Sequence, residues 1–240
     1  MLDFFQTWNF LTLALLFALP GVLVLVVRPD LRTVAARIVP FSLPFAFTES
    51  LFYPSYWEPA FLFDLGRRIG FGIEDFVFVA ALAAFSTIIY PACCNRAYAS
   101  HAPATGRACA AVRALMLLAV AGALLAVLWA AGIAVIYGAC MAMFVSGLAA
   151  AALRRDLFVP ALIGGVCAGA VYFVVCCAAD LIMPGIFQTV WHTEKFLGVF
   201  VLGVPLEELI YGGVAGFAAT SFYPYVFGLR FVRRNVERHA

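Results

Sequence analysis

The hydrophobic pattern of the chain is a series of long apolar stretches, separated by short segments that hold most of the charged residues. A helix needs about 20 mostly apolar residues to cross the hydrocarbon core of a bilayer. The run from Ala111 to Leu153 is about twice that length, so we expect it to fold as a hairpin near Ala130–Gly132. The pattern predicts seven transmembrane helices: Phe4–Val27, Val34–Tyr53, Phe71–Ala92, Ala110–Ala130, Ile133–Leu153, Leu157–Met183 and Phe196–Tyr223.

The composition agrees with an all-α integral membrane protein and excludes a soluble one. Hydrophobic residues make up 65% of the chain and charged residues 12%, whereas a soluble domain has about 25% charged residues. The formal net charge of +2 is too balanced for a nucleic-acid-binding protein. The seven cysteines and three histidines lack metal-ligand spacing, and no phosphate-binding glycine motif is present. We therefore expect no metal, no evident cofactor and no nucleic-acid partner.

The basic residues predict the orientation, because cytoplasmic loops of membrane proteins carry an excess of Lys and Arg. With the N-terminus outside, the outer segments hold only Arg67, Arg68 and Lys195. The inner segments hold the other twelve basic residues: Arg28, Arg32, Arg37, Arg96, Arg107, Arg113, Arg154, Arg155, Arg230, Arg233, Arg234 and Arg238. This bias predicts a multi-pass protein with its N-terminus outside and its C-terminus inside.

A recurrence at an offset of 133 residues indicates an internal repeat. The segment Gly70–Phe78 resembles Gly203–Tyr211, and a threonine and a Tyr-Pro pair recur further on at the same offset. Chance similarity between two apolar helices is the alternative, but a shared spacing of several features favours duplication. We expect two three-helix units, residues 1–109 and 133–240, joined by a linking helix over residues 110–132. One linking helix after three leaves both units in the same orientation, as a parallel repeat.

Carboxylates at the outer ends of the predicted helices are the candidates for chemistry, because an ionisable group at membrane depth is costly. Glu49 ends the second helix and Asp180 ends the sixth. Two adjacent pairs begin the third and seventh helices, namely Glu74 with Asp75 and Glu207 with Glu208. Helix capping is the structural alternative for the pairs, since acidic residues are favoured in a first helical turn. Capping needs one carboxylate, however, and adjacent residues point about 100° apart, so the other can face the bundle as a protonated donor.

Aromatic residues follow the second predicted helix, from Phe52 to Phe63. An aromatic belt at the membrane surface accounts for most of them, including Tyr56 and Trp57. The alternative is a pocket whose ring faces stabilise a carbocation. Phe78 and Tyr211 follow Glu74 and Glu207 by one helical turn and share their helical faces. As candidate substrate-binding residues we take Glu49, Phe78, Asp180 and Tyr211.

The two acidic helix starts resemble the lycopene cyclase domain. This domain occurs in heterodimeric-type bacterial and archaeal carotenoid cyclases and in the cyclase half of fungal fused cyclase–phytoene synthases. The family's P-x-E-[ED]-like motif is matched fully by Val204–Leu209, whereas Gly72–Asp75 has glycine where the family usually has proline. The resemblance covers nearly the whole chain and implies both three-helix units fused in one chain.

The resemblance implies that the protein closes a ring at the end of a linear carotenoid by acid/base catalysis, without net redox change. An acid protonates the terminal alkene, the carbocation closes to a six-membered ring, and a base removes a proton. We expect Glu207 and Glu74 to be the principal acid/base groups, with Glu208 and Asp75 as their partners or as caps. The apolar substrate would enter from the lipid of a bacterial cytoplasmic membrane, and the chain could form a homo-oligomer.

Two other enzyme or receptor classes are excluded by the residues themselves. An intramembrane protease with a Glu-Glu pair needs an arginine four residues later and histidines within its helices, and neither is present. A retinal protein needs a helical lysine for the Schiff base, but Lys195 is the only lysine and lies in an outer loop. The remaining alternative is a non-catalytic carotenoid- or isoprenoid-binding membrane protein with the same fold.

Overall fold

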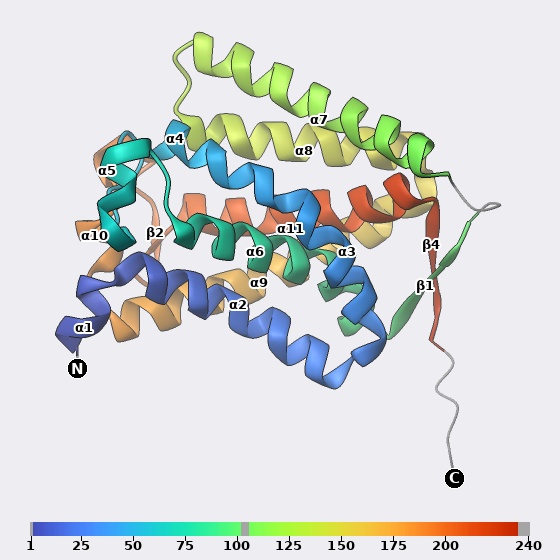
Figure 1. Ribbon diagram of the computed structural model, residues 1–240, viewed down its shortest axis with the longest axis horizontal. Helices are drawn as coiled ribbons and strands as arrows, with labels where there is room; N and C mark the ends of the chain where they lie inside the picture. Colours follow the sequence, from blue (N-terminus) through green and yellow to red (C-terminus); the bar gives the residue numbers. More distant parts are fainter. Residues whose placement is uncertain (1, 102–105, 235–240) are drawn as a thin grey trace.

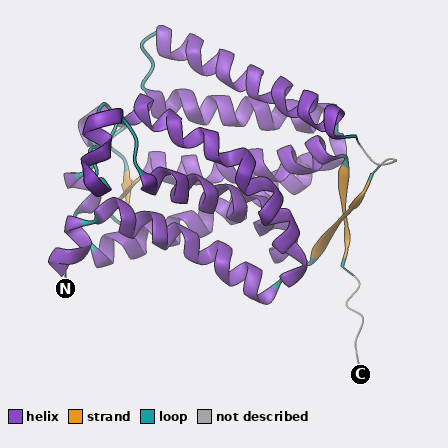
Figure 2. Ribbon diagram, viewed as in Figure 1, coloured by secondary structure: helices purple, strands orange, loops and turns teal. Residues whose placement is uncertain are grey.

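The computed structural model describes residues 2–101 and 106–234, and these residues form a bundle of long helices (Figures 1 and 2). Arg238, one of the predicted inner basic residues, lies outside the described residues. Short helices and loops gather at the end of the bundle that holds Glu49 and the starts of α6 and α11, here called the acidic end (Figure 1). A two-stranded sheet closes the opposite end, here called the strand end.

The elements have the following bounds. The long helices are α2 (Asn9–Val27), α3 (Arg32–Ser42), α6 (Ile73–Cys93), α7 (Arg107–Ala130), α8 (Val135–Leu153), α9 (Phe158–Ile182) and α11 (Leu206–Phe227). The short helices are α1 (Leu2–Thr7), α4 (Glu49–Phe52), α5 (Leu65–Ile69) and α10 (Ile186–Thr189). The 3-10 turns are η1 (Pro29–Leu31), η2 (Leu43–Thr48), η3 (Leu62–Asp64), η4 (Arg155–Leu157) and η5 (Thr193–Lys195). Strand β1 (Arg96–Ser100) pairs antiparallel with β4 (Leu229–Arg233), and β2 (Phe200–Val201) pairs with β3 (Val204–Pro205).

Five helical segments in the described part of the chain are long and apolar enough to cross a membrane: Asn9–Val27, Ile73–Cys93, Ala108–Ala130, Val135–Leu153 and Arg155–Ile182. They coincide closely with five of the seven predicted spans, and the predicted hairpin lies at Ala131–Ala134, between α7 and α8. The protein is therefore an all-α membrane protein, and the count of seven spans stays a prediction.

The second and seventh predicted helices differ from the structure. The second is helical from Arg32 to Phe52, but its α-helix gives way to the 3-10 turn η2, which has Pro44 in its first turn. The seventh was expected from Phe196, and this was wrong: α11 begins at Leu206. Gly198 and Gly203 have positive φ values of 73° and 84°, and residues 200–205 form the β2–β3 hairpin instead of helix. The 22 residues of α11 are still enough to cross a bilayer.

Helix α11 lies at the centre of the bundle, packed against α6, α8 and α9 (Figure 1). Its contact with α9 depends on small residues, because glycine lets two helix backbones approach closely. A Cβ atom on Gly216 would lie 2.2 Å from the Ala168 side chain, and one on Gly212 would lie 2.4 Å from the Tyr172 ring. Close approach of these two helices brings the first turn of α11 next to α9 and α6. Helix α7 packs mainly on α8, at the outside of the bundle.

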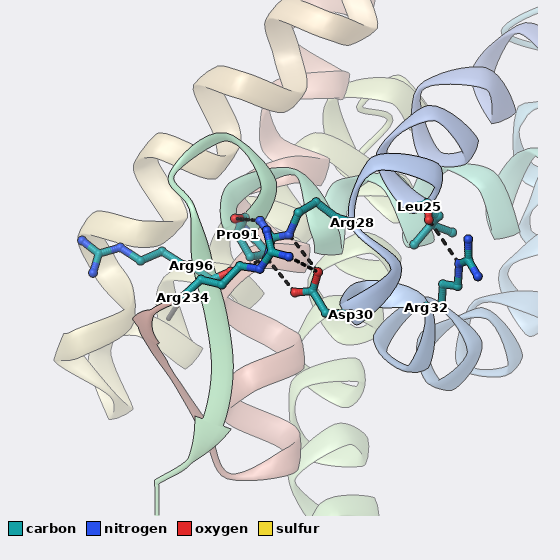
Figure 3. A network of polar contacts seen from close by, with 7 residues as sticks. All are labelled: Leu25, Arg28, Asp30, Arg32, Pro91, Arg96 and Arg234. Atoms are coloured by element: carbon teal, nitrogen blue, oxygen red, sulfur yellow. Dashed lines mark hydrogen bonds and ion pairs between the residues drawn. The ribbon is translucent and has the colours of Figure 1, made fainter. Parts of the chain in front are cut away.

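A buried arginine ties α2 to the strand end of α6 (Figure 3). The Nε and Nη2 atoms of Arg28 donate to the two carboxylate oxygens of Asp30, at 2.9 and 2.7 Å. Its Nη1 donates to the carbonyl oxygen of Pro91 at 2.8 Å, and Nη2 donates to that of Arg96 at 2.7 Å. These bonds satisfy a guanidinium that is 5% exposed, and they fix the chain where α6 passes into β1.

A second turn with the same R-x-D-L pattern follows α8. Arg154 donates to both oxygens of Asp156, at 2.7 and 2.6 Å, and to the carbonyl oxygen of Leu229 at 3.1 Å. Leu229 begins β4, as Arg96 begins β1, and the two positions are 133 residues apart. This recurrence does not appear at the 133-residue offset of the repeat, because the two R-x-D-L turns are 126 residues apart.

Candidate active site

A cavity of about 80 Å³ lies at the acidic end, between α2, η2, α4, α6, α9 and α11. Its walls are mostly aromatic and apolar, and three carboxylates are the charged groups that reach it. The lining residues are Phe10, Leu13, Phe17, Phe45, Ala46, Thr48, Glu49, Phe52, Tyr56, Trp57, Asp75, Phe78, Val79, Ile136, Tyr172, Cys176, Phe187, Trp191, Glu208 and Tyr211. The cavity thus combines acid/base groups with aromatic rings in one small space.

The second carboxylate of each acidic pair lines the cavity. Asp75 comes from the first turn of α6 and Glu208 from the first turn of α11, and both are almost fully buried. Glu74 and Glu207 precede them by one residue, which turns their side chains away by about 100°. Neither of these two lines the cavity. Position in the cavity therefore favours Asp75 and Glu208 over Glu74 and Glu207, the reverse of the expected ranking.

Glu208 accepts three hydrogen bonds from side chains. The Tyr56 hydroxyl and Trp191 Nε1 donate to Oε1, at 2.5 and 2.9 Å, and the Tyr172 hydroxyl donates to Oε2 at 2.8 Å. Burial raises the pKa of the Tyr56 phenol well above its ordinary value, so this group keeps its proton. Three rigid aromatic donors hold the Glu208 carboxyl group in one place at the edge of the cavity.

Asp75 is held differently, because it caps its own helix. Its Oδ2 accepts a hydrogen bond from the backbone N–H of Gly72 at 2.6 Å, in the manner of a capping box. The corresponding position before α11 is Pro205, which has no N–H to donate. Glu208 therefore cannot cap in this way. Asp75 can cap its helix because Gly72, which stands where the motif has proline, has a backbone N–H to donate.

Glu49 is the third carboxylate of the cavity. Its Oε1 accepts a hydrogen bond from Trp57 Nε1 at 2.5 Å. Glu49 and Asp75 line the same small cavity and are close enough to interact electrostatically. The cavity therefore holds two interacting carboxyl groups, Glu49 from α4 and Asp75 from α6, together with Glu208 from α11.

Glu74 and Glu207 both bind the loop that precedes their helix. Glu74 Oε1 accepts from the backbone N–H of Leu62 at 2.6 Å, and Glu207 Oε1 accepts from that of Leu197 at 2.8 Å. The Tyr137 hydroxyl also donates to Glu207 Oε1, at 2.7 Å. The Oε2 atom of each residue is buried without a hydrogen-bond partner. Their common role in the structure is to tie the preceding loops to α6 and α11.

Three of the four expected substrate-binding residues line the cavity, namely Glu49, Phe78 and Tyr211. Asp180 does not: it lies near the end of α9, where its Oδ1 accepts from the backbone N–H of Gly185 at 3.2 Å. This contact holds the turn between α9 and α10. A Cβ atom on Gly203 would lie 3.1 Å from Asp180 Oδ2, so the carboxylate packs against the β2–β3 hairpin and does not line the cavity.

The expectation that Tyr56 and Trp57 belong to an aromatic belt was wrong. Both side chains are buried, with exposed fractions of 7% and 8%, and both donate hydrogen bonds to cavity carboxylates. The loop folds inward because it pairs with the segment after α10: Trp57 and Trp191 form a β-bridge, and their rings lie 4.9 Å apart. Phe63, which is 71% exposed, fits the belt instead.

Comparison with protein families matches residues 134–226 to the model for lycopene cyclase. This part of the chain is similar to lycopene cyclases. The match spans α8 to α11 and thus includes Glu207, Glu208 and two of the three donors to Glu208. No curated protein and no solved structure matched the chain. The long apolar helices within and before the matched residues indicate association with lipid.

The matched segment contains donors that the sequence alone did not single out: Tyr137, Tyr172 and Trp191. No short-range pattern connects them with an acidic pair, because they lie 17 to 70 residues before the carboxylates they bind. A usable signal was the presence of tyrosine within otherwise apolar helices, since a buried hydroxyl needs a partner. Within the described residues there is no cluster of three His, Cys, Asp or Glu side chains that could hold a metal ion.

Proposed function

We propose that this protein is a membrane carotenoid cyclase, which closes a six-membered ring at the end of a lycopene-type chain without net redox change. The observation that carries the proposal is the convergence of Asp75, Glu49 and Glu208 on one aromatic cavity. The lycopene cyclase match over residues 134–226 supports the substrate class. The match suggests a substrate whose only functional groups are alkenes, and the cavity supplies carboxyl groups that can give and take protons.

The cavity suits each step of this chemistry. Protonation of the terminal alkene creates a tertiary carbocation, which the second double bond attacks to form the ring. Ring faces such as those of Phe17, Phe78 and Tyr172 stabilise positive charge, and a dry cavity protects the cation from attack by water. Loss of a proton to a carboxylate then restores a neutral product.

The substrate is proposed to enter from the lipid through the η2 side of the bundle. Phe45 of η2 both lines the cavity and is 44% exposed on the surface of the bundle. A cavity of about 150 Å³ holds one benzene molecule, so an 80 Å³ cavity is too small for a carotenoid end group. Side chains such as Phe45 must therefore move aside when the end group binds.

We further propose that the chain consists of two parallel three-helix units, and that both contribute to one site. The equal 19-residue lengths of α2 and α8, and the two R-x-D-L turns that follow them, support the duplication. Helices α6 and α11 both run from the acidic end to the strand end (Figure 1). In this proposal Asp75 and Glu208 are equivalent positions that meet on one cavity. Each protein molecule would then close one end of the carotenoid at a time.

Expression in cells that accumulate lycopene tests the proposed function. We expect cyclic carotenoids to replace part of the lycopene, as measured by chromatography of the extracted pigments. The matched control is the double variant Asp75→Asn/Glu208→Gln, expressed to the same level. If lycopene binds to the purified protein but its amount in the cells is unchanged, the non-catalytic carotenoid-binding alternative holds instead.

The proposed seven-span topology, with the N-terminus outside, predicts where reporter fusions will be found. A reporter fused after Arg155 should lie inside, and one fused after Lys195 should lie outside, because α9 crosses the membrane between them. An enzyme that is active on only one side of the membrane, such as a periplasmic phosphatase, measures this directly. Activity of both fusions on the same side would contradict the topology.

A further inference from the structure

We infer that the two sides of the cavity perform different steps: Asp75 and Glu49 supply the proton, and Glu208 removes one. This assignment rests on the proposed cyclase function and deepens it. It follows from the groups that surround each carboxyl group, not from the acidic motif, which is almost the same on both helices. The two positions have diverged in their hydrogen-bond partners although their sequences have remained alike.

The surroundings of Glu208 suit a proton acceptor. Both of its oxygens accept hydrogen bonds, and Trp191 Nε1, one of the three donors, can only donate. A carboxyl group that accepts two or three hydrogen bonds is stabilised in its ionised form. The two tyrosine hydroxyls can reverse their role, because a phenol oxygen also accepts. When Glu208 takes up a proton, its new O–H group can therefore donate a hydrogen bond to the hydroxyl oxygen of Tyr56 or Tyr172.

The surroundings of Asp75 and Glu49 suit a proton donor. Each has one oxygen occupied by an N–H donor, from Gly72 and Trp57 respectively, so one oxygen of each remains for the partner or the substrate. Two neighbouring carboxyl groups in a dry site do not both ionise, and they hold one proton between them. The α6 side of the cavity therefore keeps a proton available, whereas the α11 side presents a hydrogen-bonded carboxylate.

The resulting sequence of steps is balanced in atoms and electrons. The proton of the Asp75–Glu49 pair forms a C–H bond with the terminal alkene, whose π electrons make that bond and leave a tertiary cation. The π electrons of the second alkene form the ring C–C bond and move the cation into the ring. Glu208 then takes a proton from a neighbouring carbon, and the C–H electrons become the ring double bond. One proton returned from Glu208 to the pair restores the enzyme, so no oxidant or reductant is consumed.

Hydrogen exchange in deuterated water tests the assignment. The purified protein in lipid vesicles is supplied with lycopene, and deuterium is measured by mass spectrometry in both the cyclic product and the recovered lycopene. We expect Asp75→Asn to lower both cyclisation and deuterium uptake at least about 100-fold. Glu49→Gln should lower them in the same direction. Glu208→Gln should also lose the normal product, but its recovered lycopene should gain deuterium, because the protonated chain can return only to the donor side.

Folding of each variant is checked by its unfolding temperature in detergent, with Glu194→Gln as the matched control. Glu194 lies in an outer loop, and its carboxyl group is 65% exposed. Deuterium uptake that survives Asp75→Asn and disappears in Glu208→Gln would reverse the two roles and overturn the inference. Equal loss of uptake in both variants would overturn it as well, because no division of tasks would remain. An unaltered protein that neither cyclises nor labels lycopene would instead overturn the proposed function, and this assignment with it.

Discussion

Replacement of Glu208 by glutamine is expected to lower the conversion of lycopene by at least about 100-fold, the usual contribution of a general acid or base. The amide is nearly the same size but cannot take up a proton. Its NH2 group can donate to the Tyr172 hydroxyl, which also accepts, so the substitution removes the base and keeps the hydrogen bonds. Conversion is measured from the pigments of cells with matched amounts of protein.

The adjacent variant Glu207→Gln gives the sharpest comparison. Its amide oxygen can still accept the hydrogen bonds from the Leu197 N–H, which ties the preceding loop to α11, and from the Tyr137 hydroxyl of α8. We therefore expect a much smaller loss of conversion than in Glu208→Gln, although Glu207 stands first in the acidic motif. If Glu207→Gln abolishes conversion while Glu208→Gln retains it, the catalytic role has been assigned to the wrong carboxylate.

Replacement of Gly216 by leucine is expected to have the largest effect on stability. A Cβ atom there would lie 2.2 Å from the side chain of Ala168 and 2.8 Å from the carbonyl oxygen of Gly164. Because the second contact is with backbone, α9 and α11 would have to move apart. We expect a cost of about 3 kcal/mol or more, the upper range for overpacking. Thermal unfolding of the purified protein in detergent measures it.

Gly122→Leu is the matched control, because a Cβ atom on Gly122 in α7 meets nothing within 4 Å. The same substitution, in the middle of another apolar helix, should leave the unfolding temperature nearly unchanged. Equal destabilisation by the two variants would show that leucine is harmful in either helix for reasons other than the α9–α11 contact.

The apolar helices and their approximate ends follow from the sequence because they depend on local properties. Helix length and hydropathy decide whether a segment such as Val135–Leu153 can cross a bilayer, whatever its neighbours are. The prediction failed at Phe196, where an apolar segment forms a loop and a short hairpin before α11. Hydropathy alone does not distinguish an apolar loop packed on protein from the start of a helix. The positive φ values of Gly198 and Gly203 are tertiary features that decide this case.

The site was predicted only in part, for a related reason. The acidic pairs stood out in the sequence because charged residues are rare in apolar helices, and their place at one end followed from the helix direction. The donors that hold Glu208 did not stand out: Tyr56 lies 152 residues away in the sequence and looked like a residue of the membrane surface. Its burial depends on the bridge between Trp57 and Trp191, which joins two loops distant in the chain.

The sequence by itself therefore determined that this is a helical membrane protein with acidic pairs at the starts of two helices, since these properties belong to residue types and their spacing. Only the tertiary structure decided which carboxylate of each pair reaches the cavity. That choice depends on how α6 and α11 are rotated about their axes when they pack against α9 and α2. Pro205 has no N–H, so Glu208 cannot cap its own helix. In the folded chain its carboxyl group is held instead by three donors from distant segments.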